Sequence, residues 1–418
     1  MAINAPEKAV PVPATTPRPT GIRRAEIGMP IALLGLFVAL LPPIIETLAF
    51  KIRVLDPGNS AGALSLVLAI GAVCAMIMNP LAGRLSDRTR GRLGRRRPWI
   101  LAGVVLGYGA LLIIAFAQSV PMLLLGWALA QIFFNAAVSA LLAIMADKVR
   151  PEHRGRVAAA VGVAQNGSQV AGVYLVQLFT SSVAQTLVPG TIGVAIVIVY
   201  AFVMNDEPLT EKAPRFTLKD FLGSFYFNPA KNPDFGWAWL TRFLMTASAA
   251  TATNYLTYYL IVDFKNTTTE AATNVFHATL FYVIGIVITT FVAGAISDRI
   301  GRRKPFVLVA ALIGVVGLSI IAFAPSIGVI LLGELIMGAG IGSFYAVDLA
   351  LITDVLPKDG NNAKDLGVVN IAQALPQSLV PVGAPAAVSA FGYPGLFISG
   401  AVVGLIGAVS VFRIKASR

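Results

Sequence analysis

Charged side chains are scarce in this sequence. Asp, Glu, Lys and Arg make up 12% of its 418 residues, whereas soluble domains contain about 25%. This deficit excludes most water-soluble proteins and favours a chain that lies largely in lipid. The net charge of +12 would suggest nucleic acid as a partner of a soluble protein, but the basic residues here lie in short loops between apolar runs. That distribution is typical of membrane topology, so we expect a lipid bilayer and no nucleic acid among the partners.

Cysteine and histidine are also nearly missing, which excludes several kinds of site. Cys74 is the single cysteine, so no intramolecular disulfide can form, and the two histidines, His153 and His277, lack the spacing of metal ligands. No Gly-x-x-x-x-Gly-Lys phosphate loop is present, which argues against a built-in ATP motor. We therefore expect no metal, no cofactor and no catalytic residues, and we interpret the chain as a protein other than an enzyme.

Long apolar runs fill most of the sequence between these sparse charges. A helix needs about 20 mainly apolar residues to cross the hydrocarbon core of a bilayer. Twelve runs approach or exceed that length, so the sequence predicts an all-α membrane protein with twelve transmembrane helices. The expected spans are 29–50, 61–83, 98–117, 121–146, 156–180, 185–204, 236–263, 273–296, 305–324, 328–353, 366–390 and 394–412.

The second half of the chain repeats the sequence pattern of the first half. The motif Gly-x-x-Ser-Asp-Arg occurs at 83–88 and again at 294–299, after the second and the eighth spans. Asp147 and Asp354, which end the fourth and the tenth spans, are 207 residues apart. We therefore predict two pseudo-symmetric six-helix bundles. The predicted parts are a disordered cytoplasmic tail (1–28), the N-terminal bundle (29–204), a cytoplasmic linker (205–235), the C-terminal bundle (236–412) and a second cytoplasmic tail (413–418).

The distribution of Lys and Arg predicts the orientation in the membrane. If the N-terminus is inside, the expected outer loops hold only Lys51, Arg53 and Lys265. Arg242 falls within a span, and the rest of the 32 basic residues lie inside. Cytoplasmic loops of membrane proteins carry such an excess of basic residues. We expect both termini in the cytoplasm and a multi-pass, monomeric protein of the cell (inner) membrane.

The repeated segments resemble those of the major facilitator superfamily. The resemblance rests on Gly-x-x-Ser-Asp-Arg in both halves and on Asp-Lys-Val-Arg-Pro-Glu-His-Arg-Gly at 147–155, and it covers nearly the whole chain. The longer first copy continues through Arg-Arg-Arg-Pro-Trp at 95–99, and it is similar to the form in sucrose–proton symporters and glycoside–pentoside–hexuronide symporters. The resemblance implies a secondary transporter that works by alternating access, in which these loops control the inward–outward equilibrium.

The charged loops are expected to form a latch between the two halves on the cytoplasmic face. Asp87 can pair with several guanidinium groups. We expect Asp147 to pair with Arg88, and the repeat predicts the same for Asp354 and Arg299. The alternative is that the arginines only fix topology. The predicted latch residues are Gly83, Asp87, Arg88, Arg95, Asp147, Arg154, Gly294, Asp298, Arg299, Arg302 and Asp354.

Polar side chains within the spans are candidate substrate ligands, because burying such groups in a bilayer is costly. Several of them lie four residues apart and so share one helix face. Amides and phenols hydrogen-bond hydroxyl-rich solutes, which favours a sugar or glycoside as the small-molecule substrate. The alternative is that Asn and Gln join helices across the membrane. The predicted substrate ligands are Gln131, Asn135, Gln165, Asn166, Gln169, Asn254, Tyr255, Tyr258, Asn370, Gln373 and Gln377.

Four ionisable residues within the spans are candidates for proton coupling. A carboxyl group buried at low dielectric can exchange a proton near neutral pH, and we rank Asp348 first, Glu334 second and Glu46 third. Arg242 could pair with Asp348, because both fall in the inner part of the second half. The alternative is a static ion pair that holds the seventh and tenth spans together.

The leading hypothesis is a secondary active transporter of a sugar or glycoside, coupled to protons. A sugar uniporter is one alternative. An exporter of amphipathic drug-like or lipid compounds is another, although the fifth span lacks the Gly-Pro signature typical of drug–proton antiporters. A non-transporting sensor would need a sizeable soluble output domain, and the soluble segments are too short for one. A cavity dominated by large apolar residues would favour the exporter, and the candidates are Phe133, Phe134, Phe243 and Met245.

Overall fold

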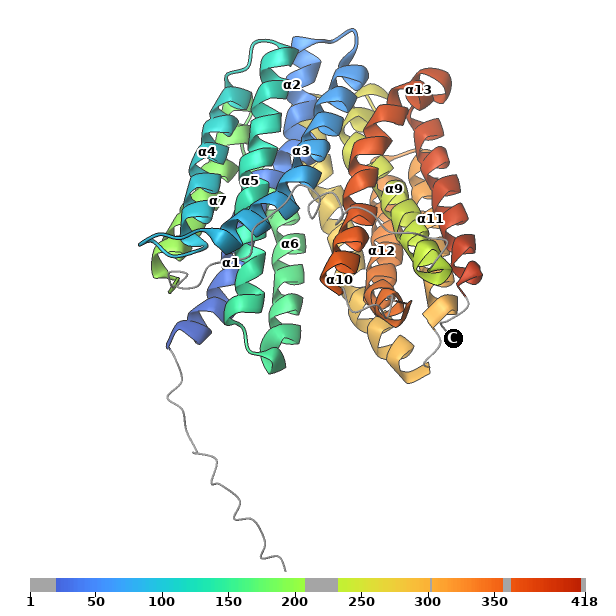
Figure 1. The fold of residues 1–418 in the computed structure, drawn as a ribbon. Coiled ribbons are helices and arrows are strands. Elements are labelled where there is room, and N and C mark those ends of the chain that lie inside the picture. The colour runs from blue at the N-terminus through green and yellow to red at the C-terminus, as the bar shows by residue number, and fades with distance from the viewer. Residues whose placement is uncertain (1–19, 207–231, 301–302, 356–361, 415–418) are drawn as a thin grey trace, which may run out of the picture.

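The computed structural model describes residues 20–206, 232–300, 303–355 and 362–414, and the regular elements in these ranges are helices (Figure 1). The first part holds α1 (Thr20–Pro42), the π-helix η1 (Pro43–Thr47), α2 (Leu48–Leu55), α3 (Ser60–Arg88), α4 (Arg97–Ala115), α5 (Val120–Lys148), the 3₁₀-helix η2 (Pro151–His153), α6 (Arg154–Gln177) and α7 (Ser182–Val203). The second part holds α9 (Pro233–Val262), α10 (Thr268–Ile300), α11 (Arg303–Ala322), α12 (Ile327–Val355), α13 (Asn362–Ser410) and the 3₁₀-helix η3 (Val411–Arg413).

Each of the twelve predicted spans falls on a helix, but some boundaries were wrong. α3 continues to Arg88 and α10 to Ile300, so the repeated motif forms the last helical turns rather than a loop. α13 covers the last two predicted spans and breaks at Gly392, where φ is 68°. Glycine adopts that φ without a steric penalty, and in Figure 1 the chain turns back at this break.

Nine stretches of the described residues are long and apolar enough to cross a membrane. α6 and α9 are not among them, because both contain several of the polar side chains that were predicted as substrate ligands. α1 begins at Thr20, so the predicted tail is helical from there on. The rest of that tail, most of the predicted linker and residues 415–418 lie outside the described ranges.

The helices form two groups that lie beside each other in Figure 1. The helices from α1 to α7 pack on one another, and so do those from α9 to α13. The groups meet along two seams, in which α3 packs against α13 and α6 packs against α10. The sequence repeat relates α3 to α10 and α6 to α13, so the two seams are equivalent under the repeat.

Glycines allow α10 and α12 to approach closely. A Cβ atom at Gly338 of α12 would collide with the carbonyl oxygen of Tyr282, and one at Gly285 of α10 would collide with the carbonyl oxygen of Leu335. Small residues permit such contacts between membrane helices. Glu334 lies one turn before Gly338, so this close packing brings Glu334 and Tyr282 to the lining of one cavity.

Local sequence fixes the start of α10 at the upper end of the molecule in Figure 1. The backbone N–H of Glu270 donates to Oγ1 of Thr267 over 3.3 Å, and the backbone N–H of Thr267 donates to Oε2 of Glu270 over 2.8 Å. This reciprocal pair is a capping box. It satisfies two N–H groups at the helix start that have no partner within the helix.

Two hydrogen bonds from α9 to α3 join the groups at the same upper end, where α3 begins and α9 stops. The hydroxyl groups of Ser65 and Tyr255 lie 2.7 Å apart and are both buried. The hydroxyl of Tyr258 donates to the carbonyl oxygen of Ser60 over 3.2 Å. These bonds assign both tyrosines to the contact between the two halves.

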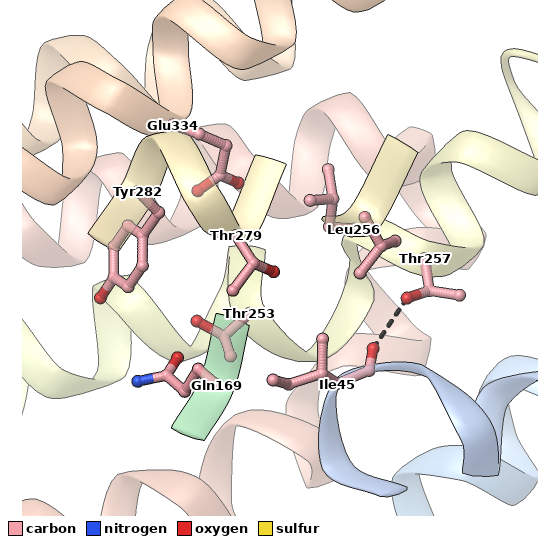
Figure 2. A pocket seen from close by; sticks show the side chains of 9 residues that line it. Ile45, Gln169, Thr253, Leu256, Thr257, Thr279, Tyr282 and Glu334 are labelled. Atoms are coloured by element: carbon pink, nitrogen blue, oxygen red, sulfur yellow. Dashed lines mark hydrogen bonds between the residues drawn. The ribbon is translucent and has the colours of Figure 1, made fainter. Parts of the chain in front are cut away.

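The π-helix η1 supplies a third hydrogen bond between the groups. Pro43 has no N–H to donate, and proline within a helix interrupts the regular bonding pattern. The hydroxyl of Thr257 donates to the carbonyl oxygen of Ile45 over 2.7 Å (Figure 2). The distorted turn of the first span thereby becomes a contact with α9.

The second seam is also packed at the upper end. Tyr174 of α6 and Phe276 of α10 lie with their ring centroids 5.4 Å apart. Toward the lower end of α6, a Cβ atom at Gly155, Gly162 or Gly167 would meet nothing within 4 Å. The described polar and aromatic contacts between the halves therefore gather at the upper end, and the structure is closed there.

Removal of the Tyr255 hydroxyl should open the upper end. In Tyr255→Phe the buried Ser65 hydroxyl loses its partner from the other half, so we expect a larger population of long distances between spin labels at Asn59 and Lys265. Pulsed electron paramagnetic resonance in a Cys74→Ala background measures this distribution. Tyr108→Phe is the control, because Tyr108 bonds Thr191 within one half over 2.8 Å. Equal distributions in the two variants would contradict the assignment.

Candidate functional site

A charged cluster lies buried among three helices of the second group. The guanidinium group of Arg242 on α9 donates to Oδ2 of Asp348 on α12 and, over 2.7 Å, to Oε1 of Gln373 on α13. Asp348 is 1% exposed and Arg242 is 9% exposed. Buried charges need a partner, and the pairing of Arg242 with Asp348 that the sequence suggested is confirmed. Gln373, predicted as a substrate ligand, belongs to the same cluster.

The cluster retains unused hydrogen-bonding capacity. Oδ1 of Asp348 and Nε of Arg242 are buried without a partner among the described residues. An unsatisfied buried polar atom costs about 1–3 kcal/mol. Oδ1 can therefore take up a proton or a hydrogen-bond donor while Oδ2 stays in contact with Arg242.

A small cavity lies between the two groups of helices (Figure 2). Its volume is about 30 Å³, which is room for one or two water molecules. Ile45 of η1 and Gln169 of α6 line it from the first group. The second group contributes residues of α9, α10 and α12, namely Thr253, Leu256, Thr257, Val275, Thr279, Tyr282 and Glu334. Gln169 and Glu334 were predicted as functional residues in two different roles, and the structure brings them together.

The predicted proton carriers lie in three different surroundings. Asp348 is paired with Arg242, whereas Glu334 lines the cavity and is 4% exposed. Glu46 in η1 is fully buried, and both of its carboxyl oxygens lack a partner among the described residues. Because the three buried carboxyl groups do not belong to one cluster, each can have a separate task.

The amides of the fourth span bond each other rather than a cavity. Nδ2 of Asn135 donates to Oε1 of Gln131 over 2.7 Å. Nδ2 of Asn79 on α3 donates to Oδ1 of Asn135 over 3.0 Å. Asn79 was not among the predicted ligands. This chain of amides joins α3 to α5, as expected for polar contacts between membrane helices.

The other predicted substrate ligands are spread over several places. Gln165 is exposed on α6, and Nδ2 of Asn166 donates to the carbonyl oxygen of Gly162 over 2.9 Å. Asn254 is buried, and its Oδ1 has no partner among the described residues. Gln377 is half-buried on α13.

The large apolar residues that would have marked a cavity for amphipathic compounds are packed elsewhere. Phe134 is buried and faces Gly107 of α4. Met245 is 2% exposed in the core of the second group. The ring of Phe243 stacks on Trp239 with a centroid distance of 5.4 Å. Phe133 is half-buried. The cavity instead combines hydroxyl groups, one amide, one carboxyl group and aliphatic side chains.

The first basic loop forms an ionic cluster around Arg96. Its guanidinium group contacts the carboxylates of Asp87 and Asp147, the latter over 3.0 Å, and donates to the Ser86 hydroxyl over 2.5 Å. Arg95 adds a second ion pair with Asp147, over 2.5 Å. Asp87 and Asp147 thus pair with guanidinium groups as predicted for acidic members of this loop.

The cluster differs from the predicted latch in two respects. The partners of Asp147 are not the expected Arg88, which ends α3 and donates back along its own helix to the Arg84 carbonyl oxygen over 2.8 Å. The ion pairs of Arg95 and Arg96 with Asp87 and Asp147 tie α3, α4 and α5 of one group together. Arg154 likewise donates within the first group, to the carbonyl oxygen of Val149 over 3.3 Å.

The structure does not describe the contacts of the predicted latch residues of the second basic loop. Arg302 lies outside the described residues. The structure also leaves out the surroundings of Gly294 and the side chains of Asp298, Arg299, Asp354 and Asn370.

Asp206 also belongs to the first cluster, although the sequence did not predict it. Its Oδ2 accepts the backbone N–H groups of Arg96 and Arg97 over 2.6 and 2.7 Å at the start of α4. The adjacent Gly94 has φ of 93°, and the carbonyl oxygen of Gly83 accepts from Arg96 over 3.5 Å. Capping residues usually lie next to the helix start in the sequence, whereas Asp206 is 110 and 109 residues away from Arg96 and Arg97 along the chain.

The segment 58–62 has the spacing Gly-x-Ser-x-Gly, which also occurs in the nucleophile elbow of hydrolases. An elbow requires a strand before the serine and a helix after it. Here α2 precedes the segment, and Ser60 starts α3 at the closed end of the molecule. The surroundings of Ser60 therefore do not match that motif.

The Arg242–Asp348 pair should be unequally sensitive to single and double substitutions. Removing one partner of a buried ion pair costs about 3–5 kcal/mol, whereas apolar replacement of both is often neutral. We expect Arg242→Met and Asp348→Leu each to lower the midpoint of thermal unfolding in detergent more than the double variant does. A double variant whose loss equals the sum of the two single losses would contradict the ion pair.

Loss of the Asp206 cap should destabilise the loop before α4. Capping interactions are worth about 0.5–2 kcal/mol, so Asp206→Ala should lower the unfolding midpoint and expose the amides of Arg96 and Arg97 to faster hydrogen exchange. The control is Asp56→Ala, which removes an exposed, local bond to the Asn59 N–H. If the exchange of these amides is the same in both variants, Asp206 is not the cap.

Two overlapping stretches of the chain match one family model. The family model for the Major Facilitator Superfamily matches residues 27–276 and 238–418. The Multidrug resistance protein MdtL of Shewanella sp. (strain ANA-3) is 34% identical over 125 residues, which is 30% of this chain and 31% of that protein. The protein of the same name from Klebsiella pneumoniae (strain 342) is 33% identical over 138 residues, 33% of this chain and 35% of that protein. The match thus spans about a third of each curated relative.

Solved structures share the fold over almost the whole chain. The nucleoside transporter NupG superposes with a TM-score of 0.71 at 12% identity, over 94% of this chain and 99% of that chain. A bacterial homologue of the human lysosomal transporter Spinster, inward-facing and occupied, gives 0.70 at 12% identity, over 96% and 98%. At this identity the likeness concerns the fold alone. The family model spans both halves, and the chain belongs to the Major Facilitator Superfamily.

Proposed function

We propose that this protein is a secondary active exporter that moves amphipathic organic compounds outward in exchange for protons. The large apolar residues expected of an exporter lie outside the cavity, but the aliphatic side chains of Ile45, Leu256 and Val275 beside its polar groups support an amphipathic ligand. A sugar site would need several free amides, and Gln131 and Asn135 are bonded to each other. The two curated relatives, which match this chain over about a third of their length, are named multidrug resistance proteins. This supports the exporter, which the sequence offered as an alternative to sugar symport.

The architecture that goes with this function has twelve transmembrane helices in two pseudo-symmetric bundles of six. The equivalence of the α3–α13 and α6–α10 seams supports this arrangement, and so does the reversal of α13 at Gly392. We place the protein in the cell (inner) membrane with both termini in the cytoplasm, because the basic residues gather in the loops on that side. In that orientation the closed upper end faces outward, and the halves rock about the cavity.

The proton would be carried by the cluster of Asp348 and Arg242. The free Oδ1 of Asp348 accepts the proton, which neutralises the carboxylate and weakens its hold on Arg242. The guanidinium group then relies more on its hydrogen bond to Gln373 of α13, the helix that packs against α3. Protonation on one side of the membrane can thereby change the packing at the seam.

A proton-coupled sugar symporter is the second candidate. It keeps the support of Asn254, whose buried Oδ1 is free among the described residues, and of Gln169 in the cavity. The extended first basic loop also resembles the loop of sucrose–proton symporters. A symporter moves protons and substrate in the same direction, whereas the proposed exporter moves them in opposite directions. This difference separates the two candidates.

Proton exchange in everted membrane vesicles tests the proposal. In vesicles acidified by respiration, ethidium or chloramphenicol should dissipate the pH gradient with wild-type protein, as reported by acridine orange fluorescence. Asp348→Asn should reduce this dissipation at least about 10-fold, since a loss of proton transfer costs that much or more. Glu152→Gln, an exposed residue at the lower end, should behave as wild type.

Two results would contradict the exporter. One is an absence of dissipation by any amphipathic compound while labelled sucrose accumulates under an inward proton gradient in right-side-out vesicles. The other is full activity in Asp348→Asn, which would remove this residue from the proton path.

A further inference from the structure

Glu334 presents an uncompensated acidic group to the cavity. It is 4% exposed, and its carboxyl group has no hydrogen-bond or ion-pair partner among the residues that the structure describes. Figure 2 shows this carboxyl group on the side of α12 that faces the residues of α10 and α9. A buried carboxylate without a partner is costly, and such a group at a cavity wall is suited to an incoming cation.

The surroundings of Glu334 offer no competing charge. None of the nine described residues that line the cavity is basic. Arg242, the basic residue placed deep in the same group of helices, is occupied by Asp348 and Gln373. An incoming cation would therefore meet one carboxylate, hydroxyl groups that can accept hydrogen bonds, and the aromatic ring of Tyr282, whose face attracts cations.

The two walls of the cavity belong to different halves of the molecule. Ile45 and Gln169 come from the first group, and Glu334 with the remaining lining residues comes from the second. A volume of about 30 Å³ admits a small head group but not a drug-sized ligand, which needs about 300–1,000 Å³. Movement of one half against the other would widen the cavity, so the carboxylate of Glu334 would meet a complete ligand in the open state.

We propose that Glu334 is the binding site for the positive charge of organic cations, and that these cations are the preferred substrates of the protein. This inference rests on the proposed export of amphipathic compounds and names the class among them. Asp348 serves the proton and Glu334 serves the substrate, so the two carboxyl groups have separate tasks. An apolar body of the cation would lie against Leu256, Val275 and Ile45, which supply the aliphatic part of the lining.

A matched pair of ligands tests this assignment. Methyltriphenylphosphonium carries a fixed positive charge, and triphenylphosphine oxide is neutral with nearly the same shape. Equilibrium dialysis with the full-length protein in detergent should give a dissociation constant at least about 10-fold lower for the cation, the effect of 1.4 kcal/mol. Glu334→Gln should remove this preference and leave the affinity for the neutral ligand unchanged, and Glu152→Gln should keep the preference.

A second measurement needs no variant. Dicyclohexylcarbodiimide modifies carboxyl groups in apolar surroundings, and mass spectrometry can follow the peptide that contains Glu334 in the wild-type protein. Methyltriphenylphosphonium should slow this modification, and triphenylphosphine oxide should protect less at equal concentration. Equal protection by both ligands, or protection by neither, would overturn the assignment.

The binding results separate this inference from the proposed function. Equal affinity for both ligands in wild type, or loss of both in a folded Glu334→Gln protein, overturns the cation site. If such a protein still exchanges neutral amphipathic compounds for protons, the exporter stands without this site. Binding of the cation through Glu334 without exchange of any amphipathic compound would keep the site and reject the exporter.

Discussion

Polar groups in a hydrocarbon layer must find partners within the protein, and this constraint orders the whole structure. The backbone satisfies it by forming helices, and most charges satisfy it by lying in the loops. Lys51 near the upper end donates to the carbonyl oxygen of Ala115 over 2.8 Å. Deep in the second group, Arg242 and Asp348 neutralise each other. The buried polar groups that lack a partner among the described residues, such as the carboxyl of Glu334, therefore mark places where a ligand or a proton can act.

The contact between the two halves is made of many small interactions rather than one strong one. Hydrogen bonds from Tyr255, Thr257 and Tyr258 close the upper end, and each bond between membrane helices is worth about 1 kcal/mol. Such a contact can form and break during transport. By contrast, Asp87 and Asp147 bind their arginines within one group and make that group more rigid. We infer that rigid halves with a weak mutual contact allow a change at the cavity to move a whole half.

The sequence predicted the helices and the family well, because both depend on long apolar runs and on a repeated motif. It also suggested the pairing of Arg242 with Asp348, since two opposite charges within the same depth of a bilayer must meet. It did not predict which arginine would reach Asp147, because seven arginines crowd one segment and the backbone of that loop decides among them. Asp206 escaped notice since its partners lie 110 and 109 residues away along the chain.

The predicted substrate ligands show where sequence patterns become ambiguous. An amide on a membrane helix can bind a solute or another helix, and only the structure shows that Asn135 bonds Asn79 and Gln131. Glu334 and Gln169 came together from opposite halves, which no spacing along the chain could reveal. The choice between sugar and amphipathic compound therefore depended on the cavity and on the names of the relatives rather than on the motifs.

Substrate-driven proton movement is the direct sign of coupled exchange. Proteoliposomes loaded with ethidium and a pH-sensitive dye start with equal pH on both sides, and dilution into ethidium-free buffer creates an outward gradient of ethidium alone. We predict that the lumen becomes more acidic as ethidium leaves through the wild-type protein, faster than in protein-free liposomes or in the Asp348→Asn variant. Ethidium efflux with an unchanged or a more alkaline lumen would contradict proton exchange.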